Sequence, residues 1–292
     1  MSKLRISVVQ YLNTAPLIRG FTHGPLRAGA AAKYELSFTV PSQCAEALRT
    51  GAADLAILPA IEYPRIVSQG TALTIVPGLA IASKERVRSL LVISKVPIRA
   101  ARRIALDPSS RSTQALIKIL AAKHWQISPE FAEGEALGQN GDDAKVGLAA
   151  MLKNADAALI IGDPALRILL ELRPSERLAI GLEDLAQAPG NGELVSDGQK
   201  WGVPDAEKLY FYDVVEEWRR MTGLPAVLAV WAGRKEVITS DVVADFLASR
   251  DFGLTQIPQI AAEAAREMGL PEKELQRYLE ENIDYTLDAE NM

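Results

Sequence analysis

The chain has 292 residues, 48% of them apolar and 24% charged, which is typical of a soluble globular protein with room for two lobes. The formal net charge is −5 and no basic stripe occurs, which argues against a nucleic-acid partner. Cys44 is the single cysteine, and the two histidines, His23 and His124, are too scattered for a histidine-rich metal site. No apolar run approaches the ~20 residues that span a bilayer, so we expect no membrane partner.

The first predicted strand begins at Leu4, where Leu4, Ile6 and Val8 alternate with Arg5 and Ser7. The stretch before it has no long apolar segment and no small-residue cleavage site of the kind found in secretory signals. We therefore expect a cytoplasmic protein, although a secreted chain without its signal would look the same.

Strands and helices then alternate along the chain. Strands are predicted at residues 34–40, 54–59, 73–83, 87–94, 102–107, 157–163 and 226–233, and helices at 41–51, 109–125 and 212–225. Ser42 and Asp213 are expected to cap two of these helices, and Gly51 and Gly223 to end them. Residues 183–205, rich in Gly, Asp and Pro, are predicted to form a long loop.

This alternation predicts an α/β protein with parallel or mixed sheets covered by helices. The chain is expected to pass between two lobes at residues 93–103, where Pro97 and a basic cluster interrupt two strands, and to return near 222–228. The first lobe then comprises residues 1–94 plus 227–292. The second, inserted lobe comprises residues 98–222.

Polar residues follow the carboxyl ends of several predicted strands, where parallel sheets and helix N-termini form a binding edge. They are Tyr11, Asn13 and Thr14; Ser42 and Gln43; Glu62; Asp107 with Ser109, Ser110, Arg111, Ser112 and Thr113; and Gly162 with Asp163. The first three groups belong to one predicted lobe and the last two to the other. We therefore expect a cleft between the lobes that brings all of them together.

The sequence "DPSSRST", residues 107–113, is the strongest single candidate for a ligand site. A helix N-terminus favours an anion by ~0.3–1 kcal/mol, and a charge-assisted bond from Arg111 adds roughly 1.5–3 kcal/mol where it forms. The alternative is a plain helix cap by Ser109 or Ser110, but capping needs fewer hydroxyl groups. A carboxylate fits better than a polyphosphate, because the chain has no glycine-rich nucleotide loop.

Other candidates leave two interpretations open. In "YLNTAPL", residues 11–17, Asn13 or Thr14 can cap a helix, or Asn13 can turn its amide into the cleft. Glu62 fits a solvated helix start better than a ligand contact.

Two function classes remain, a binding module for a small carboxylate and an enzyme that uses the same cleft. No nucleophile–base pair or metal set indicates hydrolysis.

Five motifs resemble, in order, the chorismate dehydratases of the futalosine route to menaquinone. They are "YLNTAPL", "VRSLLVISKVPI", "IALDPSSRST", "LIIGDPAL" and "YDVVEEWRRMTGLPAVLAVW". The resemblance implies a two-lobed type II periplasmic-binding-protein fold with a hinge. It also implies that chorismate, a small-molecule substrate, loses water to give 3-[(1-carboxyvinyl)oxy]benzoate without a metal or organic cofactor. A sister family that makes 1,4-dihydroxy-6-naphthoate shares the fold, but its opening motif is closer to "CPNDT".

The resemblance also assigns roles to individual residues. It implies that Asn13, supported by Tyr11 and Thr14, touches the reacting ring, and that Ser83 and Ser89 reach a carboxylate. The anion site of the second lobe is matched by Ser109, Ser110, Arg111, Ser112 and Thr113, and the "IGD" turn by Gly162 and Asp163. The chain has Ser-Thr where the family usually has Thr-Ser or Ser-Ser, and "YDVVEEW" for "YDLGEEW". The first change keeps two hydroxyl groups and the second concerns packing.

Overall fold

The computed structural model describes residues 3–24, 26–134, 136–137, 141–172, 203 and 209–291. The predicted loop at 183–205 therefore lies, apart from Val203, outside the described residues. The chain forms two compact units. The first unit comprises Met1–Lys84, Ser109–Ser112 and Pro225–Met292, and the second unit comprises Glu85–Pro108 and Thr113–Leu224.

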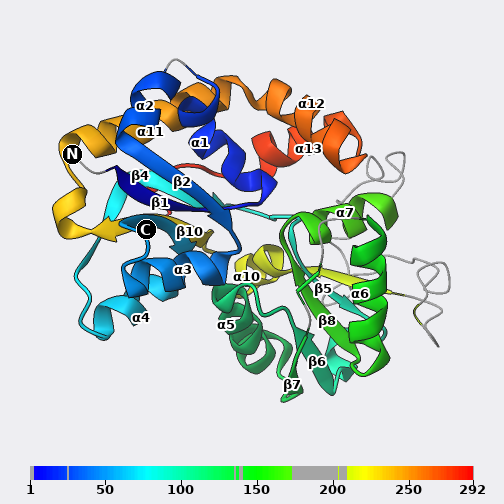
Figure 1. Ribbon diagram of the computed structural model, residues 1–292. Helices are drawn as coiled ribbons and strands as arrows, with labels where there is room; N and C mark the ends of the chain where they lie inside the picture. The colour runs from blue at the N-terminus through cyan, green and yellow to red at the C-terminus, as the bar shows by residue number, and fades with distance from the viewer. Residues whose placement is uncertain are drawn as a thin grey trace. The chain divides into compact units, whose positions relative to one another are not determined.

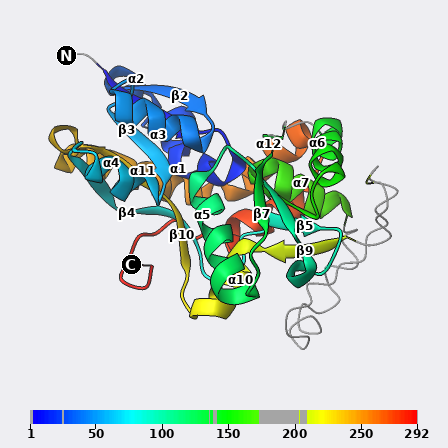
Figure 2. The same ribbon diagram turned by 90° about the horizontal axis from the view of Figure 1, so that it is seen from below.

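The first unit is built on a five-stranded mixed sheet with the strand order β2-β1-β3-β10-β4. The strands are β1 (Leu4–Val9), β2 (Tyr34–Thr39), β3 (Leu55–Pro59), β4 (Leu73–Ser83) and β10 (Ala226–Arg234). Strand β1 pairs in parallel with β2 and β3, whereas β10 runs antiparallel between β3 and β4. Figure 2 shows β2, β3, β4 and β10 from a second side. All of β3 is buried, as expected of a strand covered on both faces.

Helices cover both faces of this sheet (Figure 1). Helices α1 (Ala15–Thr22), α2 (Arg27–Lys33) and α11 (Ser240–Thr255) lie on one face, and α3 (Pro41–Thr50) and α4 (Glu62–Ser68) on the other. The chain continues after α11 as α12 (Ile257–Met268), α13 (Glu272–Arg277) and a π-helical turn at Tyr278–Asn282. Aromatic rings fill the core beneath α1 and α11: the Phe246 centroid lies 5.0 Å from those of Phe21 and Trp231.

The second unit has its own five-stranded sheet, ordered β7-β6-β8-β5-β9. The strands are β5 (Leu90–Ser94), β6 (Arg103–Leu106), β7 (Glu130–Glu133), β8 (Ala157–Ile161) and β9 (Tyr210–Asp213). Helices α6 (Gly141–Lys153) and α7 (Gly162–Leu172) lie on one face, and α5 (Arg111–Leu120) and α10 (Val214–Thr222) on the other (Figure 1). A buried apolar cluster on the α6 and α7 side includes Leu148, Leu152, Ile160 and Ile168.

The chain enters the second unit earlier than the expected position at residues 93–103. Strand β5 pairs antiparallel with β8 and β9, so it belongs to the second sheet, and the passage falls between Lys84 and Glu85. The return passage falls between Leu224 and Pro225.

The residues that begin the helices were predicted correctly in one case and wrongly in another. Asp213 caps α10, and its side chain accepts hydrogen bonds from the backbone of Val215 and Glu216, which confirms that prediction. The prediction that Ser42 caps α3 is wrong, because Val40 holds the N-cap position and no side-chain capping bond forms. The predicted helix at 109–125 is divided into α5 and a π-helical turn at Ala121–Trp125.

Glycine sets the distance between α1 and α11. A Cβ atom added to Gly253 would overlap the carbonyl oxygen of Pro16, and one added to Gly20 would lie 2.6 Å from the Cα of Ser249. These two helices therefore pack with backbone against backbone, which is possible only for small residues.

Gly253→Ala should lower the free energy of unfolding by roughly 1–3 kcal/mol, because the added methyl group pushes α11 away from Pro16. Gly29→Ala in α2 is the matched control, because no atom lies within 4 Å of the added Cβ. The control should be neutral or stabilising by up to about 1 kcal/mol. Urea unfolding of both variants measures the difference. Equal stabilities would contradict the close approach of the two helices.

Candidate functional site

Residues 109–112 group with the first unit, although the chain on either side belongs to the second. The backbone N–H of Ser42 donates to the carbonyl oxygen of Ser109 over 3.0 Å. The Tyr11 hydroxyl donates to Ser109 Oγ over 3.5 Å. Because the first N–H groups of a helix have no partner within it, Ser42 in the first turn of α3 is available to bind this segment.

A second set of contacts joins the same segment to the start of α4. The backbone N–H of Ile61 donates to Ser112 Oγ over 3.1 Å, and Arg111 Nη1 donates to Glu62 Oε2 over 3.3 Å. Arg65 Nη1 donates to the other carboxylate oxygen, Oε1, over 3.1 Å. Glu62 is only 3% exposed and pairs with both arginine side chains, so the interpretation of a solvated helix start is wrong.

Asn13 and Thr14 lie in a short 3-10 helix, Leu12–Thr14, that joins β1 to α1. Thr14 is buried and occupies the N-cap position of α1, but its side chain makes no capping bond. Its hydroxyl instead donates to Asn13 Oδ1 over 3.4 Å. This bond uses the amide oxygen of half-buried Asn13 as its acceptor, and the NH₂ group of Asn13 is the donor that the side chain can offer a ligand.

Among the predicted site residues of the second unit, Gly162 lies in a turn that a backbone hydrogen bond connects to Ser89. The N–H of Gly162 donates to the carbonyl oxygen of Ser89 over 2.7 Å, and Gly162 has a φ angle of +69°, which favours glycine. Ser89, Thr113 and Asp163 are all buried. The structure therefore brings Ser89 and Gly162 together. Contact of these residues with a ligand stays a prediction.

The Asp213 side chain also binds the backbone just before Ser89, a role that its capping pattern does not predict. Its carboxylate accepts the backbone N–H groups of Val87 at 3.0 Å and Arg88 at 2.6 Å, in addition to that of Glu216 at the start of α10. Burial raises the pKa of the Asp213 carboxyl from 3.8 to about 6, and these hydrogen bonds oppose that rise. A capping pattern alone could not reveal bonds to a segment so distant in sequence.

Ser83 and Ser110 are buried residues of the first unit, with exposed fractions of 1% and 6%. Ser83 ends β4 and lies opposite Ala226 in β10. Their contact with a substrate carboxylate stays a prediction, as does that of Arg111, whose side chain is 54% exposed.

The described part of the chain holds no group of three or more His, Cys, Asp or Glu side chains that could bind a metal ion. Among the same residues, no helix combines the length and apolar character needed to cross a membrane.

Solved structures define the class of fold. A crystal structure of an Archaeoglobus fulgidus protein matches with a TM-score of 0.63 and 17% identity, covering 99% of this chain and 92% of that one. The periplasmic aliphatic sulphonate binding protein SsuA of Escherichia coli matches with a TM-score of 0.57 and 19% identity, covering 100% and 88%. The fold is that of periplasmic binding proteins, which confirms the predicted fold class.

The sequence places the chain within a particular family. A family model described as menaquinone biosynthesis matches residues 4–188 and 194–292, so the chain belongs to this menaquinone-biosynthesis family. The chorismate dehydratase of Thermus thermophilus is 26% identical over 275 residues, which are 94% of this chain and 86% of that protein. The family resemblance drawn from the five motifs is confirmed.

Ser112→Ala should speed deuterium exchange at the Ile61 amide, because the substitution removes the oxygen that accepts this N–H. The Ser42 amide is an internal control, since its acceptor is the Ser109 carbonyl and stays in place. Residue-resolved NMR or mass spectrometry gives both rates. Unchanged exchange at Ile61 would show that Ser112 does not hold the segment on α4.

Proposed function

We propose that the protein is a chorismate dehydratase, a hydro-lyase that converts chorismate to 3-[(1-carboxyvinyl)oxy]benzoate and water. The observation that carries the proposal is the match of almost the whole chain to the menaquinone-biosynthesis family. A relative similar over 94% of this chain bears the name chorismate dehydratase, which supports this substrate.

The reaction suits a site without an evident nucleophile. The C3–H and C4–O bonds of chorismate break, the proton and the hydroxyl leave as water, and the new C3–C4 double bond makes the ring aromatic. Aromatisation supplies the driving force. The protein then has to hold one conformer, assist the leaving hydroxyl and keep solvent away.

We assign one substrate carboxylate to the hydroxyl groups of residues 109–112. Ser112 Oγ already accepts the N–H of Ile61, so its own hydrogen is available for an acceptor such as a carboxylate. Arg111 is less suited to this contact, because its guanidinium pairs with Glu62 and is half-exposed. Neutral donors therefore dominate the recognition that we propose.

Asn13 is the residue to which we assign the reacting centre. Its NH₂ group would donate to the leaving hydroxyl or to the enolpyruvyl carboxylate, while its amide oxygen accepts from Thr14. That carboxylate is attached through the ether oxygen at C3 and can fold towards the C3 proton, so the substrate itself supplies the base. An aspartate in place of Asn13 would bring a negative charge beside a dianion and repel it.

Two alternatives remain to be tested against the proposal. The shared fold with a sulphonate binding protein favours a small-anion binding module. The sister enzymes that make 1,4-dihydroxy-6-naphthoate share the pathway and the fold that the resemblance implies. Each alternative predicts that chorismate is not consumed.

Purified protein incubated with chorismate should release one water per turnover and generate the absorbance of a substituted benzoate. The same rate is expected with a chelator present, because the proposed chemistry uses no metal ion. Chromatography with mass detection identifies the product. Recovery of unchanged chorismate by a correctly folded protein would contradict the proposed function.

In the same assay, Asn13→Asp should lower turnover by about two orders of magnitude or more, the loss expected for a preorganised donor. Thermal unfolding and circular dichroism should match the wild type, because Asn13 is half-buried and bonded only to Thr14 among the described contacts. Turnover close to wild type in this variant would remove Asn13 from the mechanism.

A further inference from the structure

The two carboxylate oxygens of Asp213, at the end of β9, have different partners. Oδ1 accepts the backbone N–H groups of Val215 at 3.0 Å and Glu216 at 3.2 Å, which are the capping bonds of α10. Oδ2 accepts those of Val87 at 3.0 Å and Arg88 at 2.6 Å, and the Val87 N–H is shared with Oδ1 at 3.2 Å. A helix cap needs one side-chain oxygen, so the second oxygen has a separate role.

Arg88 adopts a backbone conformation that requires support from its surroundings. Its φ angle is +61°, in the left-handed region that residues other than glycine rarely adopt. Such a residue keeps this conformation only where the structure around it holds it in place. The charge-assisted bond from the Arg88 N–H to Asp213 Oδ2 provides this support.

The chain held by Asp213 leads directly into Ser89, which contacts the turn after β8. The Ser89 carbonyl oxygen accepts the N–H of Gly162 over 2.7 Å, and Gly162 also has a left-handed φ angle, +69°. Strand β5 begins at the next residue, Leu90, which lies opposite Ile161 of β8. The conformation of Arg88 therefore sets where Ser89 lies relative to this turn.

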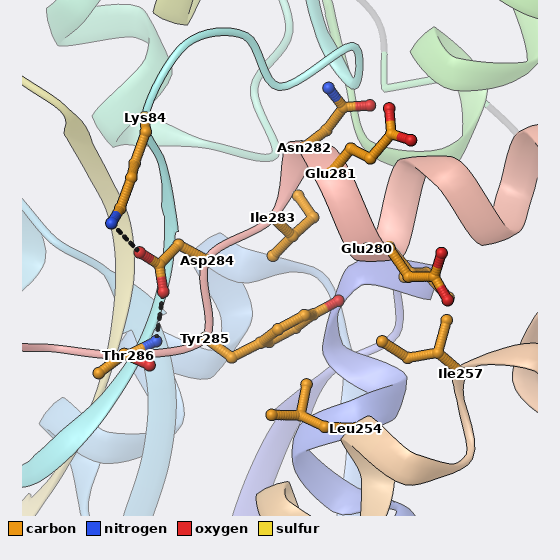
Figure 3. A pocket seen from close by; sticks show the side chains of 11 residues that line it. Lys84, Leu254, Ile257, Glu280, Glu281, Asn282, Ile283, Asp284, Tyr285 and Thr286 are labelled. Atoms are coloured by element: carbon orange, nitrogen blue, oxygen red, sulfur yellow. Dashed lines mark hydrogen bonds and ion pairs between the residues drawn. The ribbon is translucent and has the colours of Figure 1, made fainter.

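On the other side of the passage between the units, Lys84 is held by exposed ion pairs. It lies 3.5 Å from Asp284 and 2.7 Å from Glu290, and Figure 3 shows the pair with Asp284 at the edge of a pocket in the first unit. The Lys84 side chain is 43% exposed, and exposed ion pairs contribute little. The backbone bonds to Asp213 are therefore the stronger constraint on the chain before Ser89.

We propose that Asp213 is a positioning residue for the reaction: its Oδ2 holds Val87 and Arg88 so that Ser89 and the turn at residues 162–163 keep the arrangement that meets a substrate carboxylate. This inference rests on the proposed function, because it takes the turn as a contact of chorismate. Asp213 acts through Ser89 and itself touches no substrate atom. Capping of α10 alone requires neither the second oxygen nor the left-handed Arg88.

Asp213→Ser separates the two roles of the side chain. Serine caps a helix as well as aspartate does but has one oxygen, so α10 keeps its cap while Arg88 loses its acceptor. Deuterium exchange at the Gly162 amide should become about tenfold faster or more, whereas exchange at the Glu216 amide should stay within about threefold. Burial raises the pKa of Asp213 to about 6, so the wild type is measured at a pH near 8, where the carboxylate is ionised.

Lys84→Gln is the control for this exchange measurement, because it alters the same passage from the side of the first unit. It should leave exchange at the Gly162 amide unchanged. Unchanged exchange at Gly162 in Asp213→Ser, or an equal acceleration in Lys84→Gln, overturns the proposal.

Steady-state kinetics with chorismate tests the link to function. Asp213→Ser should raise KM about tenfold and change kcat by less than about threefold, because the affected contact acts on binding rather than on the reacting carbons. Thr239→Ala is the matched structural control, since Thr239 caps α11 through one bond from the N–H of Val242. It should lower the unfolding temperature and leave KM unchanged. An unchanged KM in Asp213→Ser, or an equal rise in Thr239→Ala, overturns the proposal.

Failure of the proposed function gives a different result from failure of this inference. If the wild type does not consume chorismate, the proposed function is refuted, and exchange at the Gly162 amide still decides whether Asp213 holds the turn. If the wild type is active and Asp213→Ser has the same KM and the same exchange rate, the function stands and the inference is refuted.

Discussion

The backbone N–H groups of Ser42 and Ile61 bind a short piece of chain whose sequence neighbours belong to the other unit. Helix starts leave such groups without partners, and the segment 109–112 supplies a carbonyl oxygen and a hydroxyl. The bond from Ile61 uses Ser112 Oγ as its acceptor. The hydrogen of the Ser112 hydroxyl is then available to a ligand, and the proposed recognition of a carboxylate depends on it.

The pairing of Arg111 with Glu62 has a chemical consequence. Glu62 is nearly inaccessible, and Arg65 and Arg111 both donate to its carboxylate. The positive charge of Arg111, which the sequence suggested as a contact for the substrate, is thus paired with Glu62 instead. A dianionic substrate would then be held by neutral donors, and a carboxylate engaged by two arginines is poorly placed to remove a proton. Both points favour a base that belongs to the substrate.

Local patterns predicted the features that local forces decide. The alternation from Leu4 to Val8 predicted β1, and the capping pattern predicted the role of Asp213. Contacts between residues distant in sequence decided the rest: β5 pairs with β8 and β9 in the second sheet, and buried Glu62 pairs with Arg111 as well as with its neighbour Arg65. The role of Asn13 in "YLNTAPL" was predicted from a motif and stays a prediction, whereas the bonds from Val87 and Arg88 to Asp213 have no signature in the sequence.

We propose that the base is a substrate carboxylate and that Glu62 only positions the segment 109–112. The pH dependence of kcat/KM for chorismate in the wild type and in Glu62→Gln tests it most directly, since an essential enzyme base appears as an ionisation of the free enzyme. We expect the same profile for both proteins, with kcat/KM in the variant within about tenfold of the wild type, a factor that corresponds to ~1.4 kcal/mol. Loss of the acidic limb together with activity in Glu62→Gln would instead make Glu62 the base.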